Sequence, residues 1–139
     1  LGGMKLEALG PPEDRPEGAS ANECSLVVKA STPGLSVLFP GDVEEIGEEM
    51  LMRNARSLES DVLKVPHHGG HSLTGAAFFA FVDPEVAIIS VGEDNPYGHP
   101  ARATLEALGR VGCAVYRTDM RGDIVIRVGD GGYRVECER

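Results

Sequence analysis

Hydrophobic and polar residues alternate along several short segments of this chain, and each such segment predicts a β-strand. Residues 4 to 9 fit a short edge strand that Gly10-Pro11-Pro12 ends. Residues 25 to 30 and 35 to 39 flank a Pro33-Gly34 turn, which predicts an antiparallel hairpin. Further strands are expected at residues 113 to 117, 124 to 128 and 133 to 137, the last two forming a second hairpin.

A different spacing governs the middle of the chain. Apolar residues recur at helical intervals over residues 43 to 54, which predicts an amphipathic helix. Residues 72 to 82 and 101 to 108 predict two more helices, the last with Pro100 at the first position, which proline favours. Short apolar runs typical of buried strands lie between the helices, at residues 61 to 65 and 86 to 91.

This order of elements predicts one β-rich α/β domain over residues 1 to 139, with a polar loop at residues 10 to 21. A chain of 139 residues with 42% hydrophobic residues is able to bury a core. No apolar run approaches the ~20 residues of a membrane helix, so we expect a soluble chain. Its first residue is Leu1, not Met, and we expect a piece of a longer protein.

The net charge of −9 argues against a protein that holds nucleic acid on a broad basic surface. It does not exclude a nuclease, because carboxylates that bind divalent cations add formal negative charge while the bound ions present positive charge to a phosphate.

Three of the four histidines gather in one stretch, Asp61-Val62-Leu63-Lys64-Val65-Pro66-His67-His68-Gly69-Gly70-His71. The apolar run is a buried strand that Pro66 ends, so the histidines follow a strand end. Ligands collect beyond the carboxyl ends of strands in open α/β sheets, and imidazole is the commonest metal ligand. The stretch therefore favours a metal or phosphate site over a polar loop.

Asp42 follows the strand at residues 35 to 39 and has two interpretations of equal weight. As a structural residue it caps the helix at 43 to 54, with Glu45 three residues later completing a capping box. As a functional residue it offers a carboxylate to a metal ion.

His99 precedes the third predicted helix. The partial positive charge of a helix N-terminus favours neutral imidazole, the form that ligates metal or bonds an anion, and the same amides bind phosphate. Taken alone, His99 fits a capping or loop histidine better.

All these positions follow a strand and precede a helix. With right-handed crossovers their loops lie at the same edge of one sheet, where Asp42, His67, His68 and His99 converge. Oxygen and nitrogen ligands without a thiolate suit Zn²⁺ or Mn²⁺. His71 is the weakest candidate of the group.

Five motifs stand in order over residues 22 to 128: Asn22-x-x-Ser25-Leu26-Val27, Leu38-Phe39-x-Gly41-Asp42, Asp61-Val62-Leu63-Lys64-Val65-Pro66-His67-His68-Gly69, Ala87-Ile88-Ile89-Ser90-Val91-Gly92 and Asn95-x-Tyr97-Gly98-His99-Pro100. Together they resemble the metallo-β-lactamase-like domain of ComEC-type competence proteins, the DNA-uptake channels of natural transformation. The resemblance implies an αββα sandwich with a metal centre at the edge between its sheets. It also implies phosphodiester hydrolysis, which degrades the DNA strand that is not imported.

The resemblance also implies roles for individual residues. Asp42 matches the aspartate that bridges two metal ions about 4 Å apart. The pair after the next strand matches a histidine site, with His68 favoured as the ligand and His67 supporting it in catalysis, although the reverse assignment stays open. His99 matches a histidine at the phosphate or the leaving oxygen, and Tyr97 lies in the same substrate motif. Lys64 either reaches a phosphate or is buried beside a carboxylate.

One departure from the family pattern matters. The principal motif of the superfamily, His-x-(His/Asp)-x-Asp-His, is absent, and the first histidine of the chain is His67. We therefore expect the second half of the sandwich, with most metal ligands upstream, weak metal binding and little hydrolysis by this chain alone. The uncovered sheet face predicts a homodimer or a domain-swapped assembly.

The expected partners are DNA, bound through the complete domain, and a parent channel in the bacterial plasma membrane that carries this domain outside the cytoplasm. Two alternatives remain. One is another hydrolase of the superfamily that acts on a thioester, lactone or lactam. The other is a non-catalytic domain that binds DNA or a channel partner.

Overall fold

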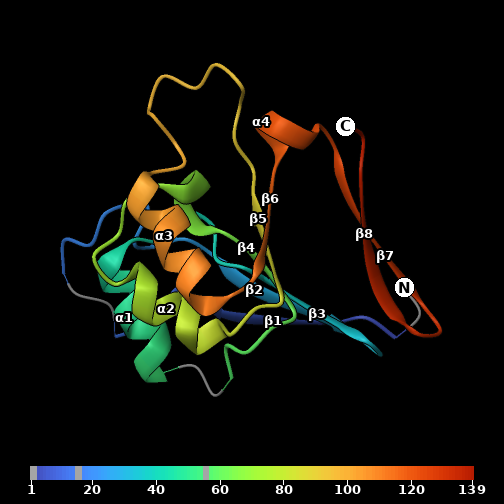
Figure 1. The fold of residues 1–139 in the computed structure, drawn as a ribbon. Helices are drawn as coiled ribbons and strands as arrows, with labels where there is room; N and C mark the ends of the chain where they lie inside the picture. The colour runs from blue at the N-terminus through green and yellow to red at the C-terminus, as the bar shows by residue number, and fades with distance from the viewer. Residues whose placement is uncertain (1–2, 15–16, 55–56) are drawn as a thin grey trace.

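A computed structural model describes residues 3–14, 17–54 and 57–139, and its main feature is a six-stranded sheet with three helices on one face (Figure 1). The strands lie in chain order: β1 (Lys5–Gly10), β2 (Val27–Thr32), β3 (Leu35–Phe39), β4 (Val62–Lys64), β5 (Val86–Ile89) and β6 (Ala114–Arg117). β1, β2 and β3 pair antiparallel, whereas β3, β4, β5 and β6 run parallel. The fold is therefore mixed α/β.

The covering helices are α1 (Glu45–Asn54), α2 (Gly75–Val82) and α3 (Arg102–Val111). Alternate strand residues point toward them, including Leu38, Leu63 and Ile89, which have no exposed surface. They pack with Leu51, Phe78 and Leu108 of the helices in one core cluster. Burial of large aliphatic and aromatic side chains, at about 1.5–3 kcal/mol each, holds the helices on this face.

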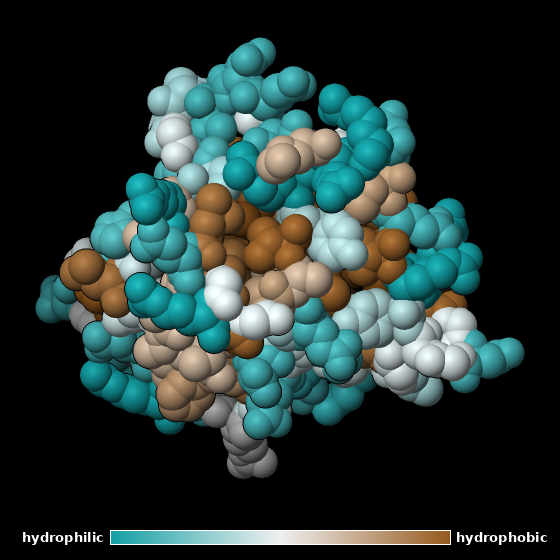
Figure 2. Space-filling model, viewed as in Figure 1, coloured by the Kyte–Doolittle hydropathy of each residue, from teal (hydrophilic) through white to brown (hydrophobic). Residues whose placement is uncertain are grey.

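Among the described residues, no helix covers the opposite face of the sheet. A separate hairpin, β7 (Ile124–Gly129) and β8 (Gly132–Cys137), stands beside it after the short helix α4 (Thr118–Arg121) (Figure 1). An apolar groove of about 570 Å³ separates the sheet from the hairpin, and Val37, Val62, Ile88 and Ile126 help to line it. Hydrophobic surface is open at the centre of the molecule in this view, between the helices and the hairpin (Figure 2).

The expected strands are all found in the described part of the chain, with ends that move by up to two residues. β1 is an edge strand, as its alternating pattern predicts. Residues 15 and 16 of the predicted polar loop lie outside the described residues. No helix of the described residues has the length and apolar character needed to cross a membrane.

The helix starts were predicted too early. α1, α2 and α3 begin at Glu45, Gly75 and Arg102, each later than the apolar spacing indicates. Pro100 is therefore not the first residue of α3, because the intervening Ala101 is extended, with φ −65° and ψ 144°. The helix also runs on to Val111, where left-handed Gly112 ends it. The expected turn after β6 is the helical turn α4.

Candidate metal and phosphate site

Parallel pairing places the segments that follow β3, β4 and β5 at one edge of the sheet. Asp42 comes after β3, the His67-His68 pair comes after β4, and His99 lies in the loop that leaves β5. Backbone hydrogen bonds join these loops: the His67 amide donates to the Gly41 carbonyl at 3.2 Å, and the Ala101 amide donates to the Gly69 carbonyl at 2.8 Å. The structure thus brings the four candidate side chains to one place.

The two adjacent histidines have an unusual backbone. His67 and His68 both have positive φ, at 47° and 53°, a region that residues other than glycine seldom occupy. The following Gly69, with φ 82°, must be a glycine, because a Cβ there would lie 2.7 Å from the Cβ of Pro100. Strained conformations of this kind concentrate at functional sites, where the surrounding fold imposes them.

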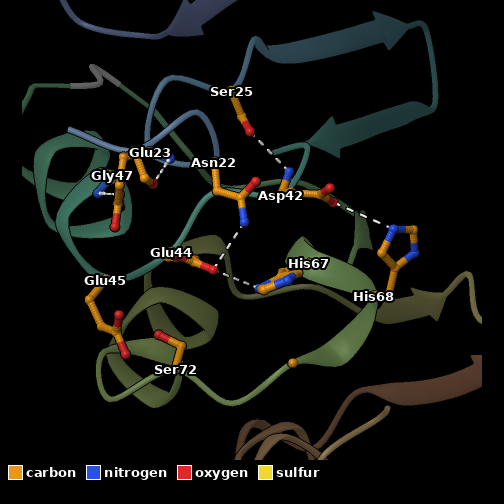
Figure 3. A network of polar contacts seen from close by, with 12 residues as sticks. Asn22, Glu23, Ser25, Asp42, Glu44, Glu45, Gly47, His67, His68 and Ser72 are labelled. Carbon is orange, nitrogen blue, oxygen red and sulfur yellow. Dashed lines mark hydrogen bonds and ion pairs between the residues drawn. The ribbon is translucent and has the colours of Figure 1, made fainter. Parts of the chain in front are cut away.

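The His68 ring is held in one tautomer. Its Nδ1 lies 2.7 Å from the carbonyl oxygen of Ser90, which only accepts, so Nδ1 carries the hydrogen. The other nitrogen, Nε2, is then an acceptor in the neutral ring, and it lies 3.6 Å from Oδ1 of Asp42 (Figure 3). Zn²⁺ binds such donors at about 2.0–2.2 Å, so this carboxylate and imidazole fit one ion between them. A carbonyl that fixes the distal nitrogen is usual for histidine ligands.

Asp42 does not cap α1, so the capping-box interpretation is wrong. The cap comes from Glu23, whose carboxylate accepts hydrogen bonds from the amides of Ile46, at 3.3 Å, and Gly47 (Figure 3). The Asp42 amide is itself held by Ser25 Oγ at 3.1 Å. A distant acidic residue thus occupies the helix N-terminus and leaves the Asp42 carboxylate turned toward His68.

His67 has a carboxylate partner that the sequence analysis missed. Its Nδ1 lies 3.0 Å from Oε1 of Glu44, and the same oxygen accepts a hydrogen bond from Asn22 Nδ2 at 3.1 Å (Figure 3). Because an ionised carboxylate only accepts, Nδ1 of His67 donates, and in the neutral ring Nε2 is the acceptor. Glu44 lies two residues after Asp42 in an acidic run. Acidic residues are common at the start of a helix because the helix dipole favours them, so the sequence alone did not single out Glu44.

His99 connects the histidine pair to Tyr97. Its ring centroid lies 5.4 Å from that of His67 at an angle of 66°, and 5.9 Å from that of Tyr97 at 21°, which is a stacked arrangement. Burial and, secondarily, the neighbouring His67 and His68 lower the pKa of His99. The neutral ring was expected from a helix N-terminus, but the causes here are burial and like-charge repulsion.

The two remaining candidates, Lys64 and His71, lie at the margins of the candidate site. Lys64 is partly buried and lines the apolar groove, and burial lowers the pKa of its ammonium group while the Asp42 carboxylate opposes that shift. His71 is exposed, and within the described residues no hydrogen bond or ion pair involves its side chain.

In residues 3–14, 17–54 and 57–139, no group of three or more His, Cys, Asp or Glu side chains is placed to hold a metal ion.

No family model matches the chain, but it is similar to segments of several bacterial proteins. It is 40% identical over 124 residues, 89% of its length, to ComE operon protein 3 of Bacillus subtilis. Identity is 33% over 135 residues, 96% of the chain, with competence protein ComA of Neisseria gonorrhoeae, and 32% over 122 residues, 88% of the chain, with recombination protein 2 of Haemophilus influenzae. The matched segments are 16%, 19% and 15% of those proteins.

Proposed function

The homologues of this chain are competence proteins of the ComEC family, and from that premise we propose that it is part of a metal-dependent phosphodiesterase domain. The substrate in this proposal is the DNA strand that is not imported during DNA uptake. The chain spans less than a fifth of each of these relatives, so the proposal concerns one segment of a larger protein.

The observation that carries the proposal is the pair of acceptors formed by Asp42 Oδ1 and His68 Nε2, 3.6 Å apart. Two acceptors at this distance repel each other unless a cation or a proton lies between them. A Zn²⁺ or Mn²⁺ ion held there would act as a Lewis acid on a phosphoryl oxygen and lower the pKa of water. The net charge of −9 adds a physical reason for a cation, because phosphate would otherwise meet a negatively charged protein.

The other residues then have separate tasks. Glu44 orients His67 through Nδ1, and the neutral ring would accept a proton at Nε2. His99, with its lowered pKa, is neutral at pH 7 and donates one hydrogen bond to a phosphoryl or leaving oxygen. Lys64 is the weaker phosphate contact, because it is partly buried beside the apolar groove.

The sheet face without helices, which the β7–β8 hairpin meets only across an apolar groove, supports a further part of the proposal. We propose that this chain forms one half of an αββα sandwich, and that an upstream half of the parent packs on this face and supplies the remaining metal ligands. Two protein donors are fewer than the three that catalytic zinc sites usually have. We further propose that the parent is a membrane channel protein that carries this domain outside the cytoplasm.

The test is cleavage of single- and double-stranded DNA in Mn²⁺ or Zn²⁺ by the chain and by an N-terminally longer version from its parent protein. We expect activity in the longer protein and its loss, by orders of magnitude, on Asp42→Asn. Asp83→Asn, at the exposed left-handed end of α2, is the matched control and should retain activity.

Other results would point to other functions. Metal binding without DNA cleavage, together with cleavage of a thioester, lactone or lactam, would favour another hydrolase of the superfamily. DNA affinity that survives Asp42→Asn, with no cleavage by the unsubstituted protein, would favour a non-catalytic binding domain.

A further inference from the structure

The loop between β5 and α3 presents an aromatic ring to solvent directly beside the histidines. Tyr97 is 79% exposed, and one face of its ring is stacked on His99. The loop projects beyond the edge of the sheet (Figure 1). A single exposed aromatic side chain is common on protein surfaces and does not by itself indicate a binding site. The residues around Tyr97 therefore have to be considered.

Those surroundings form an open pocket of about 450 Å³ that Tyr97 shares with His68, Val91, Asn95, His99 and Thr118. Phe81 of α2 is also exposed, at 55%, but it lines no described pocket with the histidines. Phe39, exposed at 46%, lines the apolar groove instead. Tyr97 differs from both phenylalanines because its ring and the candidate metal ligand His68 line the same pocket.

The loop is held in shape from within. The Asn95 side chain donates to the carbonyls of Gly92, at 3.1 Å, and His99, at 2.8 Å, and accepts from the His99 amide at 2.9 Å. These three bonds close the loop around Tyr97. The ring is therefore presented with its neighbours already ordered, which reduces the entropy lost when a planar ligand stacks on it.

The Thr118 and Asn95 side chains in the pocket have few hydrogen-bonding groups left for the edge of a base. Thr118 Oγ1 already accepts from the Val91 amide at 2.8 Å and donates to the Val91 carbonyl at 2.7 Å, and the Asn95 amide group is engaged within the loop. Residues 92 to 99 contain Glu93 and Asp94 and no lysine or arginine, so this loop does not attract a phosphate by charge. What it provides is an uncharged aromatic face.

We propose that Tyr97 is the stacking platform of a nucleobase subsite, which takes one base of a single strand while the adjoining phosphate lies at His68 and His99. This inference rests on the proposed phosphodiesterase function and adds a substrate class to it. A base in a duplex has both faces covered by its neighbours, so only an unpaired, unstacked base fits. Stacking on a ring without edge contacts makes the subsite tolerant of sequence.

The first experiment measures stacking without cleavage. The chain contains no tryptophan, so Tyr97→Trp introduces a single indole whose fluorescence reports on its own position. It is titrated in Mn²⁺ with thymidine 5′-monophosphate and with 2-deoxyribose 5-phosphate, which differ only in the base. We expect quenching by the nucleotide alone, and none in the matched control Phe81→Trp. Equal quenching by both ligands, or by neither, would overturn the proposal.

The second experiment uses the longer, active protein and separates the subsite from the catalytic centre. Tyr97→Ala should raise KM for a single-stranded oligonucleotide by roughly 5- to 150-fold, the range for loss of one stacked base, with kcat nearly unchanged. Tyr97→Phe should retain the KM of the original protein. Cleavage of an abasic strand should not change with either substitution. An equal loss of cleavage on the normal and the abasic strand would count against a base contact.

The two proposals fail in different ways. If the unsubstituted protein cleaves neither the normal nor the abasic strand, the phosphodiesterase proposal is wrong, while the titration with thymidine 5′-monophosphate still decides whether Tyr97 binds a base. If it cleaves both strands equally well with and without Tyr97, the phosphodiesterase proposal stands and the subsite does not exist.

Discussion

The Nε2 atom of His68 faces the Oδ1 atom of Asp42 at 3.6 Å, and the Ser90 carbonyl fixes the tautomer that leaves both atoms as acceptors. This relationship is formed by residues from two different loops and is stabilised by the bond from the His67 amide to the Gly41 carbonyl. In the neutral ring these two acceptor atoms repel each other, and a cation or a proton between them makes the pairing favourable.

Zn²⁺ should therefore stabilise this chain through Asp42 and His68. A ligand that binds only the folded state raises the unfolding free energy by RT ln(1 + [L]/Kd), so Tm should rise with Zn²⁺ concentration. His68→Ala or Asp42→Asn should weaken Zn²⁺ binding by more than about 10-fold in isothermal titration calorimetry. His71→Ala, which changes an exposed histidine, is the control, and an equal loss in that variant would indicate nonspecific binding.

Glu44 should be a positioning residue for His67. Glu44→Gln replaces the carboxylate with an amide that no longer requires a hydrogen on Nδ1, and we expect DNA cleavage by the longer protein to fall by about 10- to 100-fold. Nitrogen NMR of His67 should show a changed tautomer, which a loss of general stability would not produce. Glu49→Gln, which breaks only an exposed pair with Arg53, should leave both measurements unchanged.

Glu48 should give the folding stability a pH dependence of opposite sign to that of a paired carboxylate. It is 1% exposed, and burial raises its pKa while hydrogen bonds from Ser72 and Thr74 oppose the shift. A folded pKa above the unfolded value means that the folded state binds more protons, so stability falls as pH rises from about 4.3, the ordinary glutamate pKa, to the folded pKa.

The difference between the chain and Glu48→Gln isolates this effect. The glutamine is neutral and still offers an oxygen to both hydroxyl groups, so the variant should lose that part of the pH slope and be at least as stable above the folded pKa. Urea unfolding at several pH values measures the unfolding free energy of the chain and of the variant. If the unfolding free energy of the variant fell more steeply with rising pH than that of the chain, the raised pKa would have no influence on stability.

The sheet face without helices should make this chain self-associate, with a second copy of the chain as the partner. Leu6, Phe39 and Val128 are exposed apolar residues that line the groove between the sheet and the hairpin. Phe39→Glu should shift the chain toward monomer in light scattering at high concentration. Leu73→Glu removes a more exposed leucine outside that groove and should not do so. A monodisperse monomer of the unsubstituted chain at high concentration would count against this prediction.

The sequence by itself determined the elements and the place of the histidines, because periodicity and turn residues act locally. The apolar run at residues 62 to 65, ended by Pro66, is sufficient to predict a strand followed by a loop with His67 and His68. The parallel order of the middle strands follows from their alternation with helices, and with it the meeting of the loops after β3, β4 and β5.

Tertiary structure decided which side chains face one another. Asp42 fits a capping box equally well by local sequence, and only the folded chain places Glu23, 24 residues before Gly47, at the start of α1. The pairing of Glu44 with His67 and the exposure of Tyr97 beside His68 depend on how separate loops pack. No pattern along the chain encodes these contacts, because each joins residues that the fold alone brings within reach.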